Sequence, residues 1–593
     1  MTAPNLATLW GETIVDELAE SGLDAVCVAP GSRSTPLTVA FADHPDVRVF
    51  SHLDERSAAF FALGRARRTG EPTALVCTSG TAAANFHPAV IEADRSRVPL
   101  VVLTADRPAE LRDSGANQTV DQTKLYGDAV RSFQSLPEPA AEDRRLRSLR
   151  TTVCRAVATS TGTPPGPVHL NVPVAKPLEP TETPEGVGSI PESFAASNSL
   201  GVTGRDGPFV ATSQGQPRLS DAELARVAAE TDGADRGLIV AGTANRPTPA
   251  RDALGALAGA TGFPVLADPL SGVRFGDHVS AVTVCGGYDS YLGAAGDWPD
   301  PDVVLRFGAS PTSKTLRRYL RDTDARQFVV DPAGAWREAE FTATDLVTAD
   351  PTGFAEGITS RVSTDAIDAA DATETDWTER FARAERAYWD LVDPELDSTL
   401  FEGSVAGRVV GALPDPATLY VSNSMPVRDV DRFGRPRTAD LSILGNRGAS
   451  GIDGITSSAL GAASGTEDSL VLLLGDLAYY HDMNGLLAVA RCGVDATVVL
   501  VNNDGGGIFH KLPIESFDPP FTDQFKTPHG LDFEPTGELY DVDFERVADG
   551  DALVDALSSS VGSAGTQVIE VITDAAESHR HRERLHERVC EEI

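Results

Sequence analysis

Short apolar runs that end in small or polar residues recur along the whole chain. They are rich in valine, isoleucine and leucine and are apolar at consecutive positions, which is typical of parallel strands buried on both faces. Most are separated by stretches long enough for a helix, as in βαβ units. The pattern therefore predicts an α/β fold with doubly wound, mainly parallel sheets. The runs occupy residues 24–32, 73–80, 99–108, 166–174, 237–243, 263–268, 302–311, 327–332, 418–426, 440–446, 469–476, 496–504 and 567–574.

Two segments interrupt this pattern and divide the runs into three groups. Residues 181–208 are rich in proline, glycine, serine and acidic residues, and residues 363–376 are small and acidic. Both compositions are typical of exposed linkers between domains. We therefore expect three domains of ordinary size, at residues 1–180, 209–362 and 377–593.

Polar residues and glycines follow two consecutive predicted strands of the third domain. Gly475 and Asp476 end one strand, and Asn503 and Gly505 follow the next. Ligands of parallel sheets bind at the carboxyl ends of strands. Carboxylate, amide and carbonyl oxygens suit Mg²⁺, whose coordination is often completed by the phosphates of a ligand. The pair of motifs predicts a metal and phosphate site, although a tight turn would explain either motif alone.

A candidate catalytic acid lies in the first domain. Glu55 follows a short predicted strand and opens an apolar segment with a helical pattern, and Asp54 is equally placed. The helix dipole favours acidic residues at this position, so this motif alone indicates only a structural role. A carboxyl that is partly buried beside apolar side chains would instead have a raised pKa, which suits proton transfer.

Composition and charge argue against a nucleic-acid partner and indicate the cellular compartment of the protein. The formal net charge is -37, whereas binding to nucleic acids requires a basic surface. So acidic a surface, with only five lysines, is typical of a salt-adapted protein. No apolar run is long enough to span a membrane, and the N-terminus lacks the features of a signal peptide. The six scattered cysteines indicate neither a zinc site nor disulfides, so we expect a cytoplasmic protein.

The histidines near the C-terminus do not form a metal-binding pattern. His579, His581 and His586 do not share one helix face. The segment that contains them is therefore predicted to be a solvated terminal helix.

Six longer motifs identify a known family. They are APGSRSTPL (29–37), TADRPAELRDSGANQTVDQ (104–122), SNSMPVRDVD (422–431), LGNRGASGIDG (444–454), GDLAYYHDMNGL (475–486) and NNDGGGIFHKLP (502–513). Together they closely resemble the 2-succinyl-5-enolpyruvyl-6-hydroxy-3-cyclohexene-1-carboxylate (SEPHCHC) synthases, which are thiamin-diphosphate-dependent enzymes of menaquinone biosynthesis. The 27-residue separation of Asp476 and Asn503 resembles the thiamin-diphosphate motif of the wider superfamily. The resemblance covers all three domains, and only the linkers match poorly.

The resemblance implies that the chain binds thiamin diphosphate with Mg²⁺ or Mn²⁺. The expected metal ligands are Asp476, Asn503 and the carbonyl of Gly505. Glu55 is the expected catalytic residue and faces the aminopyrimidine ring of the cofactor. Ile452 is expected to support the thiazolium ring. Further cofactor contacts are expected from Ser424, Gly475, Leu477, Gly506, Ile508 and Phe509, with Leu477 standing where many of these enzymes have glycine.

The resemblance also implies a reaction and its substrates. The family decarboxylates 2-oxoglutarate and adds the succinic-semialdehyde carbanion to isochorismate in a 1,4 sense. Arginine side chains match substrate carboxylates well because they bind them with two parallel hydrogen bonds. Some relatives carry an arginine where this chain has Thr315, next to one of the candidates. The expected substrate-binding residues are Ser32, Arg33, Arg107, Asn117, Gln118, Lys314, Ser424, Arg428 and Arg447.

The two cofactor-binding domains of this superfamily meet across a subunit interface. The resemblance therefore implies a homodimer or homotetramer with active sites between subunits. Another thiamin-dependent carboligase or decarboxylase, such as an acetohydroxyacid synthase, is an alternative, and the motifs GANQ and NRGASGIDG argue against it. A non-catalytic regulatory subunit is an alternative of a different class, and the presence of Glu55 and Asp476 argues against it.

Overall fold

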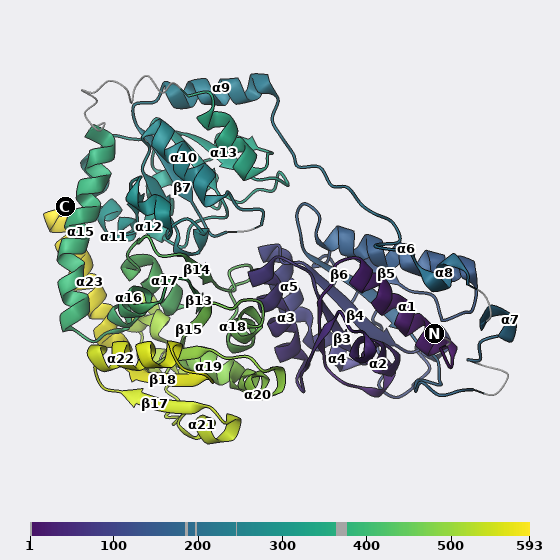
Figure 1. Cartoon of the computed structure of the whole chain (residues 1–593). Helices are drawn as coiled ribbons and strands as arrows, with labels where there is room; N and C mark the ends of the chain where they lie inside the picture. Colours follow the sequence, from purple (N-terminus) through teal and green to yellow (C-terminus); the bar gives the residue numbers. More distant parts are fainter. Residues whose placement is uncertain (1–2, 184–187, 196–197, 245, 363–375) are drawn as a thin grey trace. The chain divides into compact units, whose positions relative to one another are not determined.

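The computed structural model describes residues 3–183, 188–195, 198–244, 246–362 and 376–593 (Figure 1). The predicted acidic linker at 363–376 lies outside this part of the chain except for Asp376, where a helix begins. The chain divides into two compact units. Unit 1 consists of Met1–Gln214, Asn446–Glu467 and His481–Val494, and unit 2 consists of Gly215–Gly445, Asp468–Tyr480 and Asp495–Ile593.

Three six-stranded sheets form the framework of the two units. Their strand orders are β2-β1-β3-β4-β6-β5, β12-β11-β10-β7-β8-β9 and β14-β13-β15-β16-β18-β17. Neighbouring strands are parallel in all three sheets. The predicted α/β fold with three doubly wound parallel sheets is therefore confirmed.

The first sheet belongs to unit 1. Its strands are β1 (Ala25–Val28), β2 (Arg48–Ser51), β3 (Thr73–Cys77), β4 (Leu100–Asp106), β5 (Ser132–Ser135) and β6 (Pro167–Pro173). Helices α1 (Leu6–Glu20), α2 (Thr35–Asp43) and α6 (Asp143–Ser160) enclose an apolar core with it, and α1 and α6 lie side by side (Figure 1). Helices α3 (Glu55–Thr69), α4 (Thr81–Asn85) and α5 (His87–Ser96) contact one another in turn, and α3 packs on β3.

The described part of the predicted first linker packs on this domain. It contains two short helices, α7 (Glu192–Ala195) and α8 (Leu200–Thr203). Arg150 of α6 is buried and donates hydrogen bonds to the carbonyls of Gly201 (2.9 Å) and Val202 (3.0 Å). These contacts place α8 against α6.

The second sheet lies in unit 2. Its strands are β7 (Gly237–Ala241), β8 (Val265–Ala267), β9 (Val284–Cys285), β10 (Val303–Phe307), β11 (Arg326–Val330) and β12 (Asp345–Val347). Helices α9 (Asp221–Asp232), α10 (Arg251–Thr261) and α13 (Pro351–Thr359) share an apolar core with it. Helices α11 (Tyr288–Tyr291) and α12 (Lys314–Arg321) contribute to a second cluster, which also includes residues of the long helix α15 (Asp376–Ser398).

The third sheet, also in unit 2, carries the predicted metal motifs. Its strands are β13 (Ala417–Val421), β14 (Leu441–Leu444), β15 (Ser469–Gly475), β16 (Thr497–Asn502), β17 (Asp543–Val547) and β18 (Gln567–Ile572). The helices associated with it are α16 (Glu402–Ala412), α17 (Met425–Phe433), α19 (Asp476–Asp482), α21 (Pro535–Tyr540), α22 (Gly550–Val561) and α23 (Ala575–Glu592). β15 and β16 are neighbours, so the two motifs end adjacent strands.

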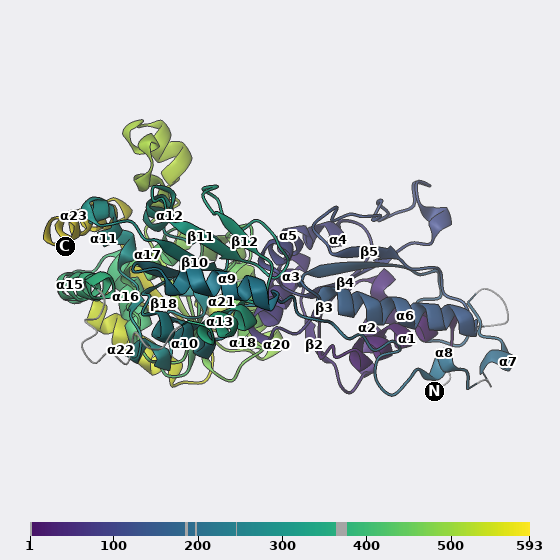
Figure 2. The ribbon, with the colours of Figure 1, turned by 90° about the horizontal axis from the view of Figure 1, so that it is seen from above.

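The C-terminal helix α23 differs from the prediction of a solvated helix. Arg582, Leu585 and Val589 are buried, and α23 packs along α15 (Figure 2). The buried positions of α23 recur at every third or fourth residue, as on one face of a helix, but Ser578 and Arg582 among them are polar, so the sequence shows no continuous apolar stripe. The buried arginine has no such signal in the sequence.

Two glycines allow α3 to pack closely on α18 (Ile455–Ala463) within unit 1. A Cβ atom on Gly64 would lie 1.8 Å from the carbonyl oxygen of Ser458, and one on Gly461 would lie 1.9 Å from that of Phe61. Only glycine permits so close an approach of two helix backbones. The crossing fixes the helix that begins at Glu55 against the segment that follows Ile452.

Among the described residues, no helix is long and apolar enough to cross a membrane.

Candidate functional site

A buried carboxylate joins the ends of β15 and β16. Asp476 directly follows Gly475, the last residue of β15. Its Oδ2 accepts hydrogen bonds from the backbone N–H groups of Asn503 (3.1 Å) and Gly505 (3.0 Å), and its Oδ1 accepts one from Leu477 (2.7 Å). These bonds fix the loop after β16 around Asp476.

The two polar atoms of the Asn503 side chain differ in their hydrogen bonding. Its Nδ2 donates a hydrogen bond to Oε1 of Glu402 at 2.6 Å. Its Oδ1 is buried and has no hydrogen-bond partner within the described part of the chain. A buried amide oxygen without a partner is costly, so a group outside the protein is expected to bind there.

The donor set around Asp476 suits a hard divalent cation. It combines a carboxylate, the amide oxygen of Asn503 and the backbone carbonyl of Gly505, all of which are oxygen ligands that Mg²⁺ accepts. The described residues contain no cluster of three or more His, Cys, Asp or Glu side chains that could hold a metal. Since this set contains a single carboxylate, that result does not conflict with the predicted site.

The three glycines after Asp504 make close contacts with the protein itself. Gly505 has a φ of 134°, and a Cβ on it would lie 2.1 Å from the carbonyl oxygen of Lys526. A Cβ on Gly507 would lie 2.7 Å from Nδ2 of Asn503. Gly505 and Gly506 are predicted contacts of the metal and cofactor, and the structure adds that larger residues in this run would displace the loop after β16 itself.

Residues 506–509 continue into a short 3-10 turn. Gly506 donates a backbone hydrogen bond to the carbonyl of Lys526 (2.8 Å). Ile508 and Phe509 are half-buried, and the ring of Phe509 packs edge-on against Phe525 with centroids 5.5 Å apart. These two predicted cofactor contacts thus follow the loop after β16 directly.

Asp504 and His529 hold the segment around residues 529–531 against the loop after β16. The Asp504 carboxylate accepts hydrogen bonds from the backbone N–H groups of His529 (2.9 Å) and Gly530 (2.7 Å). Nδ1 of His529 accepts from the N–H of Leu531, so the ring carries its proton on Nε2, which lies 3.2 Å from Oδ2 of Asp476. Asp504 had no predicted role, and no sequence motif pointed to His529.

A second acidic side chain that the sequence did not indicate lies behind Asn503. Glu402 begins α16 and is buried, and its Oε2 accepts a hydrogen bond from Arg582 at 2.6 Å. Burial raises the pKa of the Glu402 carboxyl, and the adjacent Arg582 guanidinium opposes that shift. A contact between residues 101 positions apart leaves no local pattern in the sequence.

In unit 1, the two neighbouring acids at the start of α3 have different surroundings. Asp54 caps the helix by accepting from the N–H groups of Arg56 (2.7 Å) and Ser57 (3.4 Å), and it also accepts from Asn484 (2.6 Å). Glu55 is half-buried, and the described residues provide no hydrogen bond to its carboxylate. Asp54 therefore takes the structural role that the sequence left open between the two.

Two predicted substrate-binding arginines lie close together in unit 1. Burial lowers the pKa of the Arg33 guanidinium, and the positive charge of nearby Arg107 lowers it further. Among the described residues the Arg33 guanidinium donates one hydrogen bond, to the carbonyl of Val174 (2.6 Å), while Nε of Arg107 is buried and has no partner there. Two adjacent arginines with spare donors favour an anionic ligand.

The polar candidates of unit 1 lie on exposed turns. Ser32 is exposed and begins the short 3-10 turn that contains Arg33. Gln118 has a left-handed φ of 54°, and its Nε2 donates to the carbonyl of Ser79 (3.0 Å). Asn117 beside it is exposed.

Residues 446–454 form a loop that packs on α5. The Glu92 carboxylate accepts hydrogen bonds from the N–H groups of Gly448 (2.8 Å) and Ala449 (2.6 Å). These bonds hold the loop in place, and Arg447 within it is half-buried. The candidate arginine is thus carried by a fixed backbone.

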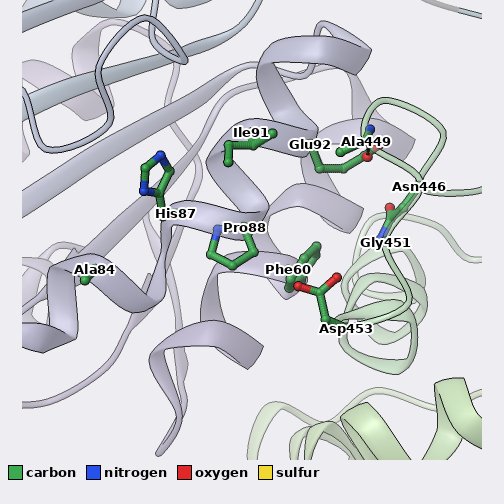
Figure 3. Close-up of a pocket in the computed structure, with 10 residues that line it drawn as sticks. All are labelled: Phe60, Ala84, His87, Pro88, Ile91, Glu92, Asn446, Ala449, Gly451 and Asp453. Atoms are coloured by element: carbon green, nitrogen blue, oxygen red, sulfur yellow. Dashed lines mark hydrogen bonds between the residues drawn. The ribbon is translucent and has the colours of Figure 1, made fainter. Parts of the chain in front are cut away.

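A cavity of about 480 Å³ adjoins this loop. Phe60 of α3, His87 and residues of α5 line one side, and Gly451 and Asp453 line the other (Figure 3). Ile452, which is half-buried, lies between these last two residues in the chain. The helix that begins at Glu55 and both chain neighbours of Ile452 therefore line this cavity, whereas Ile452 itself is not among its lining residues.

The remaining candidates lie in unit 2. Ser424 precedes α17 with a φ of 71°, an unusual conformation for a residue with a side chain, and its carbonyl accepts a hydrogen bond from Arg428. Lys314 is exposed at the start of α12. Ser313 beside it donates to Asp289, which also binds Arg432 of α17. These contacts connect the start of α12 to α17.

The structure thus groups the predicted residues into two sets. Unit 1 contains Ser32, Arg33, Glu55, Arg107, Asn117, Gln118, Arg447 and Ile452. Unit 2 contains Lys314, Ser424, Arg428, Gly475, Asp476, Leu477, Asn503, Gly505, Gly506, Ile508 and Phe509.

Three family models match successive parts of the chain. The N-terminal TPP binding domain of thiamine pyrophosphate enzymes matches residues 10–125. The middle domain of thiamine pyrophosphate enzymes matches residues 213–421, and the C-terminal TPP binding domain matches residues 433–571.

Similar proteins match over nearly the full length. The chain is 62% identical to the 2-succinyl-5-enolpyruvyl-6-hydroxy-3-cyclohexene-1-carboxylate synthase of Haloarcula marismortui, with 100% of both chains covered. It is 46% identical to the synthase of the same name from Roseiflexus castenholzii, with 96% of this chain and 97% of the relative covered. A solved structure, the thiamine diphosphate-dependent 4-hydroxybenzoylformate decarboxylase of Rhodococcus jostii RHA1, shares the fold with a TM-score of 0.70 at 18% identity, covering 95% of this chain and 99% of that one.

Proposed function

Because the chain belongs to the thiamine pyrophosphate enzymes and, within them, to the SEPHCHC synthases, we propose that each of the two sets of residues described above contributes to cofactor or substrate binding. The protein is an enzyme that uses thiamin diphosphate to form SEPHCHC in menaquinone biosynthesis. Full-length relatives with the synthase name do not favour an acetohydroxyacid synthase or a regulatory subunit.

The buried oxygen of Asn503, which has no partner in the described part of the chain, is the observation that carries the proposed metal site. Asn503, Asp476 and the carbonyl of Gly505 would hold Mg²⁺ or Mn²⁺, which in turn would bind the diphosphate of the cofactor. Gly475 ends β15, Leu477 lies in the first turn of α19 and Gly506 follows Gly505, and the backbone of these three residues is proposed to border the diphosphate.

Glu55 is proposed to be the catalytic residue. When bound, thiamin diphosphate supplies the electron sink that decarboxylation of a 2-oxo acid requires. The Glu55 carboxylate would exchange a proton with the pyrimidine nitrogen, a role that its half-buried position and lack of described partners allow. Ile452 and Ser424 would position the rings, and Ile508 and Phe509 would exclude water.

The proposed substrates are 2-oxoglutarate and isochorismate. Both carry carboxylates, and the paired Arg33 and Arg107 offer the matching charge inside an acidic protein. Arg428, Arg447 and Lys314 are proposed to bind the remaining carboxylates. Ser32, Asn117, Gln118 and Ser424 are proposed to provide neutral hydrogen bonds.

The proposed assembly is a homodimer or homotetramer with active sites between subunits, in the cytoplasm of a salt-adapted organism. The net charge of -37 supports the salt adaptation, as do full-length relatives from Haloarcula and Halobacterium. Light scattering at molar KCl tests the assembly. A monomer that retains full activity would contradict active sites between subunits.

A substrate comparison tests the proposed function. The enzyme with cofactor and Mg²⁺ is given isochorismate together with either 2-oxoglutarate or pyruvate, and CO₂ release and adduct formation are measured. We expect adduct formation with 2-oxoglutarate only, because pyruvate lacks the distal carboxylate that the arginines would bind. Turnover of pyruvate alone would contradict the proposal and favour a decarboxylase.

A further inference from the structure

A buried chain of charged groups connects the C-terminal helix to the loop after β16. Arg582 of α23 donates from Nε and Nη2 to the two oxygens of Asp429, each at 2.7 Å. Nη2 also donates to Oε2 of Glu402 at 2.6 Å. The other oxygen of Glu402 accepts from Nδ2 of Asn503 at 2.6 Å. The side chains of Arg582, Asp429 and Glu402 are each only 3% exposed.

This chain of contacts determines which end of the Asn503 amide faces outward. Arginine has donors only, so Glu402 must present an acceptor to Arg582. A carboxylate also presents an acceptor to Asn503, and only the NH₂ end of an amide can donate to it. The carbonyl end of Asn503 is consequently the end that has no partner among the described residues.

We propose that Glu402, held by Arg582, is a positioning residue that orients the Asn503 amide with its oxygen toward the metal. The inference rests on the proposed metal site and extends it to residues from two helices distant in sequence. An amide that turned over would present two hydrogens to a divalent cation and would not bind it. Outer contacts that orient a metal ligand typically change metal affinity by about 10- to 100-fold.

The variant Glu402→Gln tests this directly, because it keeps the shape of the side chain. The introduced glutamine must present its oxygen to Arg582 and its NH₂ to Asn503. Asn503 would then turn its oxygen toward that glutamine and its NH₂ toward the metal. We expect Mg²⁺ binding to the enzyme with thiamin diphosphate, measured by calorimetry, to weaken by at least about 10-fold.

A second substitution should reverse this loss. In Glu402→Gln with Asn503→Asp, the introduced aspartate accepts from the NH₂ of the introduced glutamine and offers its other carboxylate oxygen to the metal. The double variant should therefore bind Mg²⁺ at least about 10-fold more tightly than Glu402→Gln alone. Asn503→Asp alone should bind weakly, since two carboxylates would face each other across the 2.6 Å contact.

Recovery of Mg²⁺ affinity in the double variant distinguishes a positioning role of Glu402 from a purely stabilising one. This distinction is needed because removal of a buried ion pair also destabilises the folded protein. Arg588→Met is the matched control. Arg588 lies in α23, as Arg582 does, and forms a partly exposed ion pair with Glu395 of α15 (2.7 Å). Its removal should leave Mg²⁺ affinity unchanged. Melting temperatures are measured for all variants.

Two results would overturn the inference. One is a Glu402→Gln variant that binds Mg²⁺ as tightly as the unmodified enzyme, and the other is a double variant weaker than both single variants. The same titration with Asp476→Ala tests the underlying site. If Asp476→Ala also leaves Mg²⁺ affinity unchanged, the proposed metal site itself is wrong. If Asp476→Ala lowers Mg²⁺ affinity and Glu402→Gln does not, only the positioning role of Glu402 is refuted.

Discussion

At the scale of single residues, two adjacent acids at the start of α3 differ in what they contact. Asp54 is engaged by the helix it caps and by Asn484. Glu55 is half-buried, and its charge contributes to the raised pKa of the buried Cys77 thiol, which places it near the end of β3. Asp54 therefore caps the helix, and Glu55 remains the residue proposed for proton transfer.

Glu55→Gln should lower turnover by at least about 100-fold, because the amide cannot exchange a proton. Cofactor binding, measured by calorimetry, should persist. The matched control is Asp54→Asn, which should retain most activity since asparagine caps helices as well as aspartate does. Equal loss of activity in both variants would contradict the assignment.

Asp476→Ala should lower the affinity for Mg²⁺ and for thiamin diphosphate together. The carboxylate is both a proposed ligand and the acceptor for two N–H groups of the loop after β16. Calorimetry with and without EDTA measures both affinities. Asp504→Ala should have a smaller effect, because Asp504 contacts the backbone of the neighbouring loop. A larger loss in Asp504→Ala would reverse the two roles.

Sequence alone could predict only the part of the site that short motifs carry. Asp476 and Asn503 follow consecutive strands, so their proximity follows from the parallel sheet. His529 and Glu402 approach the same loop from distant segments, and no periodic pattern or spacing relates them to it. The packing of residues 446–454 onto α5 is likewise a tertiary contact without a local signal.

At the scale of elements, the crossing of α3 and α18 depends on glycine. Gly64→Ala should lower stability by at least about 2 kcal/mol, because its new methyl group would meet backbone rather than a flexible side chain. Gly411→Ala is the control. Gly411 lies in α16 with no atom within 4 Å of a new Cβ, so alanine should stabilise by about 0.5 kcal/mol. Thermal unfolding measures both, and equal effects would contradict the close crossing.

The strands illustrate what the hydrophobic pattern predicts and what it misses. Every predicted apolar run contains a strand, because helices cover both faces of the central strands. β5, β9, β12 and β17 were not predicted. All four lie at sheet edges, and the sequences of β5 (SFQS) and β17 (DFERV) are polar because these strands are partly exposed. Edge strands owe their pairing to the neighbouring strand rather than to their own pattern.

At the scale of the whole molecule, the buried His52 contributes to the dependence of stability on pH. Burial, with help from Arg491, lowers the pKa of His52 to about 4, compared with about 6.5 in an unfolded chain. Above pH 6.5 the ring is neutral in both states. Between pH 6.5 and 4 only the unfolded state gains the proton, so stability falls as pH falls, by up to about 3 kcal/mol.

His52→Phe should reduce this dependence while keeping the ring contact with Phe61, whose centroid lies 4.8 Å away. Scanning calorimetry from pH 7 to 4 should show a shallower fall of melting temperature than in the unmodified protein. Parallel curves for the two proteins would show that His52 is not a neutral buried group.

The net charge of -37 predicts that salt stabilises the protein. Repulsion between surface carboxylates is screened over about 10 Å at 0.1 M salt and over about 3 Å at 1 M. The melting temperature and activity should rise together between 0.1 and 2 M KCl. An unchanged melting temperature over that range would contradict the salt adaptation.

The most direct test of the central claim is a crystal structure of the enzyme with thiamin diphosphate, Mg²⁺ and 2-oxoglutarate. We expect Mg²⁺ within about 2.1 Å of the Asn503 amide oxygen, an Asp476 oxygen and the Gly505 carbonyl. We also expect the Glu55 carboxylate at hydrogen-bond distance from the pyrimidine ring. A metal bound by other residues, or a pyrimidine ring that contacts no carboxylate, would contradict this claim.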